Sequence, residues 1–249
     1  MTAFPPRAAG APVELPPGEV HVWAARLDPP PERVAALRAT LAADERARAD
    51  RFRFEVHRRR FAVGRGLLRE LLGAYLGAPP ERLAFVYGER GKPDLAPATA
   101  RPGAPLHFNL SHSHELFVLA VTREREIGAD VEQLKPMDDL ERIAERFFSA
   151  PENAALRGLP PAERQRAFFR CWTRKEAYLK AVGVGLAAPL DSFVVTLGPE
   201  EPPRMLSLEQ DAARGERWNL WHLEPEEGYL GAVAVEAAGL TLRAWMMVT

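Results

Sequence analysis

The decisive stretch of this chain is residues 172–180, WTRKEAYLK, which lies inside a segment predicted to be helical from 161 to 182. Glu176 and Lys180 are four residues apart, so their side chains lie on one helix face, about one turn from each other. Glu176 is also one turn from Trp172 and borders the apolar stripe of this helix, where a carboxylate is partly desolvated. The alternative is an ordinary surface ion pair, which an i,i+4 Glu–Lys spacing also predicts.

Two further carboxylates stand earlier in the chain, in residues 127–132, IGADVE. Asp130 and Glu132 alternate with apolar residues, so on a half-buried strand they point to the same face. Adjacent like charges are unfavourable unless a cation or hydrogen-bond donors compensate them, and Mg²⁺ binds through one or two carboxylates together with substrate phosphates. With Glu176 and Lys180, these acids predict a magnesium site for a phosphate-bearing substrate. A solvated strand end is the alternative for Asp130 and Glu132.

A polar cluster, residues 109–114 with the sequence NLSHSH, follows a predicted strand. Its backbone N–H groups, Ser111 and His112 could bind a phosphate. A hydrogen-bonded turn explains the same residues equally well. A metal site made from His112 and His114 is less consistent, because zinc would require a further Cys or His nearby.

Basic residues that could contact phosphates occur at several other positions. Lys92 stands in the Gly-Lys-Pro turn of residues 91–94, and Arg48 lies on a basic helix predicted over residues 44–54. Either side chain is equally consistent with a solvated surface charge. The run Arg58–Arg60 predicts a solvated face or a contact for an acidic partner.

The composition is that of an ordinary globular protein: 249 residues, 47% hydrophobic and 27% charged. A net charge of -1 argues against general nucleic-acid binding. No apolar run is long enough to span a bilayer, and residues 1–18 lack the apolar core of a signal peptide. Cys171 is the single cysteine, which excludes an internal disulfide and favours a cytoplasmic protein.

The predicted elements alternate between helices and strands in two similar series. Helices are expected near residues 32–37, 44–54, 57–76, 138–147, 151–156 and 161–182. Strands are expected near residues 83–87, 107–110, 116–122, 127–132, 192–197, 218–223, 229–235 and 240–248. This pattern predicts an α+β protein with two similar α+β halves in one chain. The halves are expected at residues 19–122 and 123–249, the second carrying the metal-binding acids, after a mobile Pro-rich segment at 1–18.

Four motifs occur in a fixed order along the chain: GKPDL at 91–95, FNLSHS at 108–113, GADVE at 128–132 and WTRKEAYLK at 172–180. Together they resemble the Sfp-type 4′-phosphopantetheinyl transferases, and the resemblance extends over about residues 44–193. Ala129 stands where the family has a larger aliphatic residue, and His114 stands where a small or polar residue is usual. Neither departure falls on a presumed ligand.

The resemblance implies a fold of two α+β halves with the cofactor in the cleft between them. It implies three Mg²⁺ ligands at the pyrophosphate of coenzyme A: Asp130, Glu132 and Glu176. It implies further contacts to coenzyme A phosphates: Arg48, Lys92, Ser111, His112, Asp130 and Lys180. Glu176 and Lys180 are the catalytic residues in this interpretation.

The activity implied is transfer of the 4′-phosphopantetheine arm of coenzyme A to a serine of an apo acyl or peptidyl carrier protein, with release of adenosine 3′,5′-bisphosphate. Such a transfer depends on positioning and charge neutralisation, and Glu176 is the candidate to take the serine proton, directly or through water. We expect a monomer, because both halves lie in one chain. The alternatives are a non-catalytic coenzyme A- or nucleotide-binding protein, against which the acids and Lys180 count, and another Mg²⁺-dependent phosphotransferase.

Overall fold

The computed structural model describes residues 2–8, 13–88, 91–99, 105–183 and 189–248. Its helices are α1 (Pro31–Ala39), α2 (Ala43–Asp50), α3 (Glu55–Leu76), α4 (Leu140–Phe147), α5 (Ala150–Gly158), α6 (Pro161–Val182) and α7 (Ala212–Glu216). Two short 3₁₀ helices are η1 (Pro80–Arg82) and η3 (Leu190–Ser192). Of the described helices, none is both long and apolar enough to cross a membrane.

The strands form two larger sheets and two small ribbons. The five-stranded sheet has the order β1 (Pro6–Ala8), β12 (Thr241–Val248), β2 (Glu19–Arg26), β6 (Leu116–Thr122) and β5 (His107–Ser113). The three-stranded sheet has the order β10 (Asn219–Leu223), β11 (Tyr229–Val235) and β7 (Ile127–Gln133). The ribbons pair β3 (Phe85–Tyr87) with β4 (Pro93–Leu95), and β8 (Phe193–Val195) with β9 (Met205–Leu208).

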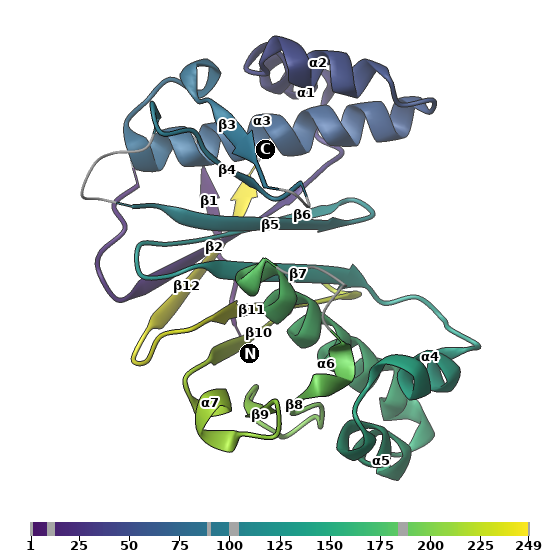
Figure 1. The fold of residues 1–249 in the computed structure, drawn as a ribbon. Coiled ribbons are helices and arrows are strands. Elements are labelled where there is room, and N and C mark those ends of the chain that lie inside the picture. The colour runs from purple at the N-terminus through teal and green to yellow at the C-terminus, as the bar shows by residue number, and fades with distance from the viewer. Residues whose placement is uncertain (1, 9–12, 89–90, 100–104, 184–188, 249) are drawn as a thin grey trace.

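The molecule has four layers, with the two larger sheets face to face between helical layers (Figure 1). One apolar core joins α3 to the five-stranded sheet and contains Leu67 and Phe117. A second lies between the sheets and contains Val118 and Val131, and a third joins α6 to the three-stranded sheet. The central strand β6 is covered on both faces, which explains why all its residues are buried and only the last, Thr122, is polar.

Both long helices have 22 residues and end at a glycine with positive φ, Gly77 at 61° and Gly183 at 73°. Glycine adopts this left-handed conformation without the steric penalty of a Cβ, so it terminates each helix at a defined residue. The helix predicted over 161–182 is confirmed at both ends.

Two series of elements repeat in the same order, which confirms the α+β class. Each begins with a strand, continues with two short helices, a 22-residue helix, a 3₁₀ turn and a two-stranded ribbon, and ends with two strands. The second series has one further short helix, α7, between its ribbon and its last two strands. The repeated strands also occupy equivalent places: β2-β6-β5 in one sheet correspond to β7-β11-β10 in the other. The division of the chain at residues 122 and 123 stays a prediction. β12, which follows the second series, pairs with β2 of the first.

The structure corrects two of the sequence-based assignments. Residues 19–26 form the central strand β2, where no strand was expected, although its buried core residues Val20, Val22 and Trp23 are strand-forming. The strand expected at 107–110 continues through Ser113, so the polar cluster is not a turn; the turn follows at His114, whose φ is 50°. Polar residues are tolerated there because β5 is the edge strand of its sheet.

The described part of residues 1–18 contributes to the fold. β1 pairs in parallel with β12, and the side chains of Val13 and Leu15 are buried against the core that contains α3. The mobility expected for residues 1–18 stays a prediction.

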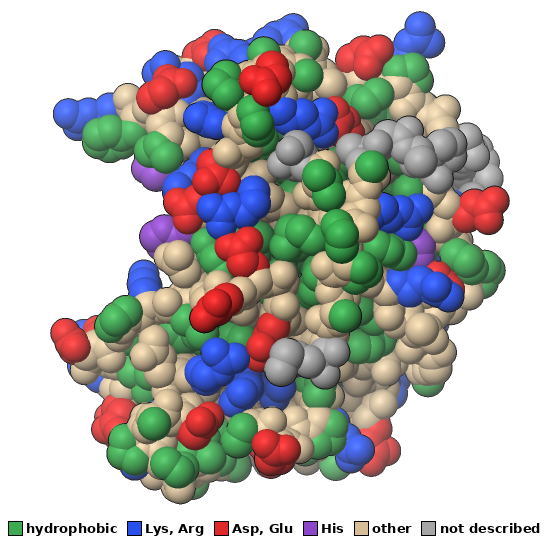
Figure 2. Space-filling model, turned by 180° about the vertical axis from the view of Figure 1, so that it is seen from behind, with side chains coloured by type: hydrophobic (Ala, Val, Ile, Leu, Met, Phe, Trp, Pro, Cys, Tyr) green, Lys and Arg blue, Asp and Glu red, His purple; other side chains and the backbone are tan. Residues whose placement is uncertain are grey.

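On the face of the molecule opposite to the view of Figure 1, acidic and basic side chains are interspersed (Figure 2). The outline is hollowed between the two helical layers.

Candidate active site

Side chains of the edge strand β5 bind β7 at alternate positions. The backbone N–H of Ala129 donates to Asn109 Oδ1 at 2.9 Å. Ser111 Oγ donates to Asp130 Oδ1 at 3.0 Å, and Ser113 Oγ donates to a carboxylate oxygen of the next acid, Glu132, at 2.8 Å. Because side chains on a strand alternate between faces, Asn109, Ser111 and Ser113 all leave β5 from the same face. This face lies against β7.

The ammonium of Lys180 joins this array from the last turn of α6. Its Nζ lies 2.6 Å from Asp130 Oδ1 and donates to Ser111 Oγ at 3.0 Å. Ser111 and Asp130 are buried, whereas the side chain of Lys180 keeps 29% exposure. The structure therefore brings together two of the predicted phosphate contacts and one predicted metal ligand, with the ammonium still open to solvent.

The carboxylate of Asp130 lies near enough to Glu132 and Glu176 to raise the pKa of both. Burial raises the pKa of Glu176, and repulsion from Asp130 and then from Glu132 adds to it. Burial also raises the pKa of Glu132, again with a contribution from Asp130, although Ser113 and Lys180 act in the opposite direction. Lys180 and Ser113 therefore compensate the negative charges of Glu132 and Glu176 only in part.

Two carboxylate oxygens of these acids lack a partner and could bind a further ligand. Asp130 Oδ2 and Glu176 Oε1 are buried and have no hydrogen-bond partner among the described residues. Oxygen donors of this kind suit a hard divalent cation, which would also reduce the repulsion between the carboxylates. Within the same described residues, no three His, Cys, Asp or Glu side chains already stand in a metal-binding arrangement. A cation would thus draw the acids together.

The close approach of α6 to β7 depends on Gly128. A Cβ at this position would collide with the backbone of Ala177 and approach the amide nitrogen of Ala181. Only glycine lets the helix backbone pack directly on the strand, and this packing carries Glu176 and Lys180 to the acids of β7.

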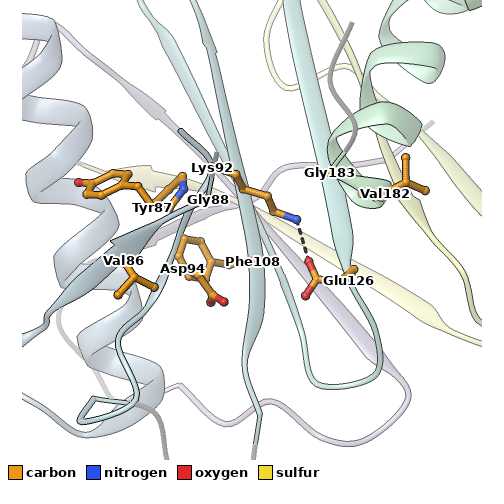
Figure 3. A pocket seen from close by; sticks show the side chains of 11 residues that line it. Val86, Tyr87, Gly88, Lys92, Asp94, Phe108, Glu126, Val182 and Gly183 are labelled. Atoms are coloured by element: carbon orange, nitrogen blue, oxygen red, sulfur yellow. Dashed lines mark hydrogen bonds and ion pairs between the residues drawn. The ribbon is translucent and has the colours of Figure 1, made fainter. Parts of the chain in front are cut away.

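Lys92 lies at the other end of the site and connects the two helical layers. Its Nζ lies 2.7 Å from Glu126 Oε2 and donates to the backbone oxygen of Lys180 at 3.2 Å. Figure 3 shows Lys92 reaching toward Glu126 across a cavity of about 400 Å³, with Val182 at its edge. His107 hydrogen bonds to the second oxygen of Glu126, and His107 and Lys92 together lower the pKa of Glu126 to about 2.

A second, smaller cavity of about 270 Å³ joins Lys92 to Lys180. It is also lined by Asn109 and Leu110 of β5 and by Gly183 at the end of α6. The predicted nucleotide contact Lys92 and the predicted pyrophosphate contact Lys180 thus line the same small cavity, which shares the lining residues Lys92, Pro93 and Gly183 with the larger one.

His112 and Arg48 lie apart from the acids, on the side of β5 that faces α3. The exposed ring of His112 lines a cavity of about 330 Å³ with Arg60 and Phe61. Neighbouring atoms desolvate the ring, and the charges of Lys180 and Arg60 add to this effect, so the pKa of His112 is lowered. The exposed guanidinium of Arg48 lies 5.3 Å from the ring centre of Phe61, at the rim of this cavity.

Sequence reasoning missed four residues that the structure includes. Asn109 and Ser113 hold β5 to β7. Glu126 binds Lys92, and His107 binds the other oxygen of Glu126. The period of two on β5 could have revealed Ser113, because it shares a strand face with Ser111. The Lys92–Glu126 pair has no local signal, since its members are 34 residues apart.

Comparisons with known proteins cover most of the chain. A family model described as the 4′-phosphopantetheinyl transferase superfamily matches residues 126–234, and a model of the 4′-phosphopantetheinyl transferase N-terminal region matches residues 25–124. The 4′-phosphopantetheinyl transferase HetI of Nostoc sp. is 46% identical over 227 residues, 91% of this chain and 92% of that protein. The transferase psf-1 of Bacillus pumilus is 38% identical over 68% of this chain and 69% of its own length.

Among solved structures, the holo-acyl-carrier-protein synthase of Thermotoga maritima gives a TM-score of 0.36 and 20% identity, covering 45% of this chain and 62% of that one. This similarity is too low to support an argument about the chain. The sequence identity to HetI, which extends over nearly the full length of both proteins, is decisive. The chain belongs to the 4′-phosphopantetheinyl transferase superfamily.

Proposed function

We propose that this protein transfers the 4′-phosphopantetheine arm of coenzyme A to a serine of an apo acyl or peptidyl carrier protein, with Mg²⁺ as cofactor. The observation that carries the proposal is the convergence of Asp130, Glu132 and Glu176 on Lys180, where β5, β7 and α6 meet. The matches to transferases along the chain support the same reaction.

Asp130, Glu132 and Glu176 are the residues that would hold Mg²⁺. The unsatisfied oxygens of Asp130 and Glu176, and the repulsion among the acids, fit a divalent cation, which when bound would neutralise charge on the pyrophosphate of coenzyme A. Lys180 contributes a fixed ammonium on the same side, and Ser111 orients it by accepting one of its hydrogen bonds. A preorganised positive charge of this kind stabilises charge that develops on phosphate oxygens.

In the proposed reaction the hydroxyl oxygen of the carrier serine forms a bond to the β-phosphorus of coenzyme A. The bond from that phosphorus to the bridging oxygen breaks, and adenosine 3′,5′-bisphosphate leaves. Glu176 accepts the serine proton, directly or through water. His112, Arg48 and Lys92 bind the nucleotide end of coenzyme A.

We further propose that the protein acts in the cytoplasm as a monomer. Both elements that supply the acids belong to one chain, so the site needs no second copy. The buried single cysteine and the net charge of -1 are consistent with a reduced compartment and with a partner other than nucleic acid.

A mass-spectrometric assay tests the proposed activity. The protein is incubated with an apo carrier protein, coenzyme A and Mg²⁺, and the carrier is weighed; a gain of one phosphopantetheine group is expected. A chelator should abolish the gain and Mg²⁺ should restore it. If several carriers of different pathways gain no mass while the protein binds coenzyme A, the protein is a binder rather than a transferase. If coenzyme A is instead cleaved without a carrier, it is a different phosphotransferase.

A further inference from the structure

The helix that carries Glu176 and Lys180 also holds two buried arginines away from the site. Arg170 and Arg174 are one turn apart on α6, with 8% and 2% exposure. Arg174 donates through Nη1 to the backbone oxygen of Thr196 and, at 3.1 Å, to its hydroxyl. His222 on β10 shares the carboxylate of Glu224 with Arg166, which is one turn before Arg170 on α6, so His222 lies beside this part of the helix. After the effect of burial, both arginines lower the pKa of His222.

Neither arginine has a carboxylate at ion-pair distance among the described residues. Glu224, which directly follows β10, is already bound: it accepts a hydrogen bond from Arg166 at 2.9 Å and contacts His222 Nε2 at 3.0 Å. Glu163 and Glu200 act on Arg170 only through longer-range attraction, as Glu201 does on Arg174. The two guanidinium groups are therefore buried without a direct counter-ion.

Three nitrogen atoms of this cluster are buried and lack hydrogen-bond partners within the described part of the chain: Arg170 Nη1, Arg174 Nε and His222 Nδ1. Burial of a cation without a partner is strongly unfavourable, and desolvation lowers the pKa of Arg174 to about 10. An anion between these groups would supply both the missing counter-charge and the missing hydrogen-bond acceptors. Guanidinium groups present paired N–H donors that match the oxygens of phosphate or sulfate.

We propose that Arg170, Arg174 and His222 form a second anion site, which binds a small tetrahedral oxyanion such as inorganic phosphate or sulfate. The anion reaches the cluster from the side of Arg166 and His222, whose side chains keep 39% and 16% exposure. Bound there, it stabilises α6 from the side of β10, whereas Asp130 binds Lys180 from β7. This inference does not depend on the proposed transferase activity.

The test is the affinity of the full chain for inorganic phosphate, measured by titration calorimetry and by thermal unfolding against chloride of equal ionic strength. Because the candidate active site also offers phosphate contacts, the measurement is repeated in a Lys180→Ala, His112→Ala background. A saturable response that survives in this background is expected. Its absence there would overturn the proposal.

Substitutions locate the site. Arg170→Gln should weaken phosphate binding about tenfold or more, because charge-assisted hydrogen bonds are lost. The matched control is Arg142→Gln, which removes the same charge from a side chain that is 80% exposed, and it should leave the affinity unchanged. Wild-type affinity in Arg170→Gln would contradict the assignment. If that variant does not fold, Arg170→Lys, which keeps the charge but loses the paired donors, serves instead.

Different anions define the ligand class. Sulfate should compete with phosphate at the same site, since both are tetrahedral and carry several oxygens. Acetate, a planar carboxylate with one charge, should bind at least tenfold more weakly. Acetate binding as tight as that of phosphate would refute the tetrahedral assignment.

Discussion

At the residue scale, Lys180 is held by a strand rather than by its own helix. Its ion pair is with Asp130 of β7, and Ser111 of β5 accepts a further hydrogen bond. Glu176, one turn earlier, is left with a raised pKa next to two other acids. The i,i+4 spacing therefore brings both side chains to the same strand but does not make them partners.

Glu176→Gln should lower kcat by about a hundredfold or more, because the glutamine cannot accept a proton and binds a cation poorly. The fold should remain intact, since the substitution removes repulsion from Asp130 and Glu132. Steady-state transfer assays and circular dichroism check both expectations. Glu163→Gln, in the first turn of the same helix, is the control. Normal turnover in Glu176→Gln would remove this residue from the site.

The raised pKa values of Glu132 and Glu176 predict how stability depends on pH. In the folded state these carboxyls keep protons at pH values where the unfolded chain has released them. Without Mg²⁺, their contribution to the free energy of unfolding should therefore decrease as pH rises from the ordinary value of 4.5 through the raised values. Mg²⁺ binds the ionised forms, so its stabilising effect should increase over the same range.

Urea denaturation at several pH values, with and without Mg²⁺, measures this dependence. Glu132→Gln and Glu176→Gln should each flatten the decrease in the metal-free protein. Glu55→Gln, whose side chain is 75% exposed in its pair with Arg58, should not. Parallel curves for all four proteins would show that the acids of the site are not coupled in this way.

At the scale of elements, the contact between α6 and β7 decides where the acids and Lys180 meet. Gly128→Ala should destabilise the fold by about 1–3 kcal/mol and reduce transfer strongly, because the added methyl group collides with the backbone of Ala177. Chemical denaturation and transfer assays measure both effects. Gly158→Ala at the end of α5 is a suitable control, since its Cβ would meet no atom within 4 Å. Full activity in Gly128→Ala would mean that the close contact is dispensable.

Besides its contact with β7, α6 is held in place by a buried ion pair between Lys175 and Glu152. Lys175 Nζ lies 2.9 Å from Glu152 Oε2, with 0% and 1% exposure, and it donates to the backbone oxygens of Leu190 and Phe193 at 2.7 Å each. Glu152 also accepts hydrogen bonds from Ser149 and from the N–H of Val195. The pair thus ties α6 to the start of α5 and to β8, which explains the role of a lysine that the sequence left unassigned.

Lys175→Met should destabilise the protein by about 3–5 kcal/mol, because it leaves the Glu152 carboxylate buried without its cation. The double variant Lys175→Met, Glu152→Gln should recover part of this loss, since it removes the unpaired charge. Equilibrium denaturation of the single and double variants forms the cycle that measures the coupling. Additive effects of the two substitutions would show that the pair is not coupled.

At the scale of the whole molecule, the C-terminal strand β12 joins β1 to β2 in the five-stranded sheet. β12 lies between β1 and β2 and is parallel to both. Its Met247 belongs to the core around α3, and its Ala244 belongs to the core between the two sheets. The two series of elements are therefore connected by the end of the chain as well as by the link between β6 and β7.

Removal of residues 241–249 should abolish cooperative unfolding and reduce the soluble yield, because it uncovers the edge of β2 and opens two cores. Thermal unfolding followed by circular dichroism measures the loss. Val248→Lys, at a side chain that is 59% exposed, should leave the melting temperature within a few degrees of wild type. A truncated chain that melts like the full one would show that β12 is an accessory strand.

The sequence by itself determined the type of chemistry and most of the longer helices and strands, although not the central strand β2. The helix over 161–182 was predictable to the residue, because an apolar period of 3.6 begins after Pro160 and ends at Gly183. Asp130, Glu132, Glu176 and Lys180 were identifiable because their spacing on a strand and a helix gives each pair one face. The α+β class followed from the order of these elements.

Only the tertiary structure decided the partners. Ser113 with Glu132, Lys92 with Glu126, and β12 with β2 join residues that are far apart in the sequence, so no local period reveals them. For the polar stretch of β5, the sequence left a turn and a phosphate contact equally open for the same reason: its strand conformation depends on pairing with β6. Likewise, Arg170 and Arg174 look like solvated charges on a helix until packing against Thr196 and His222 buries them. Local propensity favours a helix or a strand in each segment, whereas burial and long-range pairing decide which charged side chains meet.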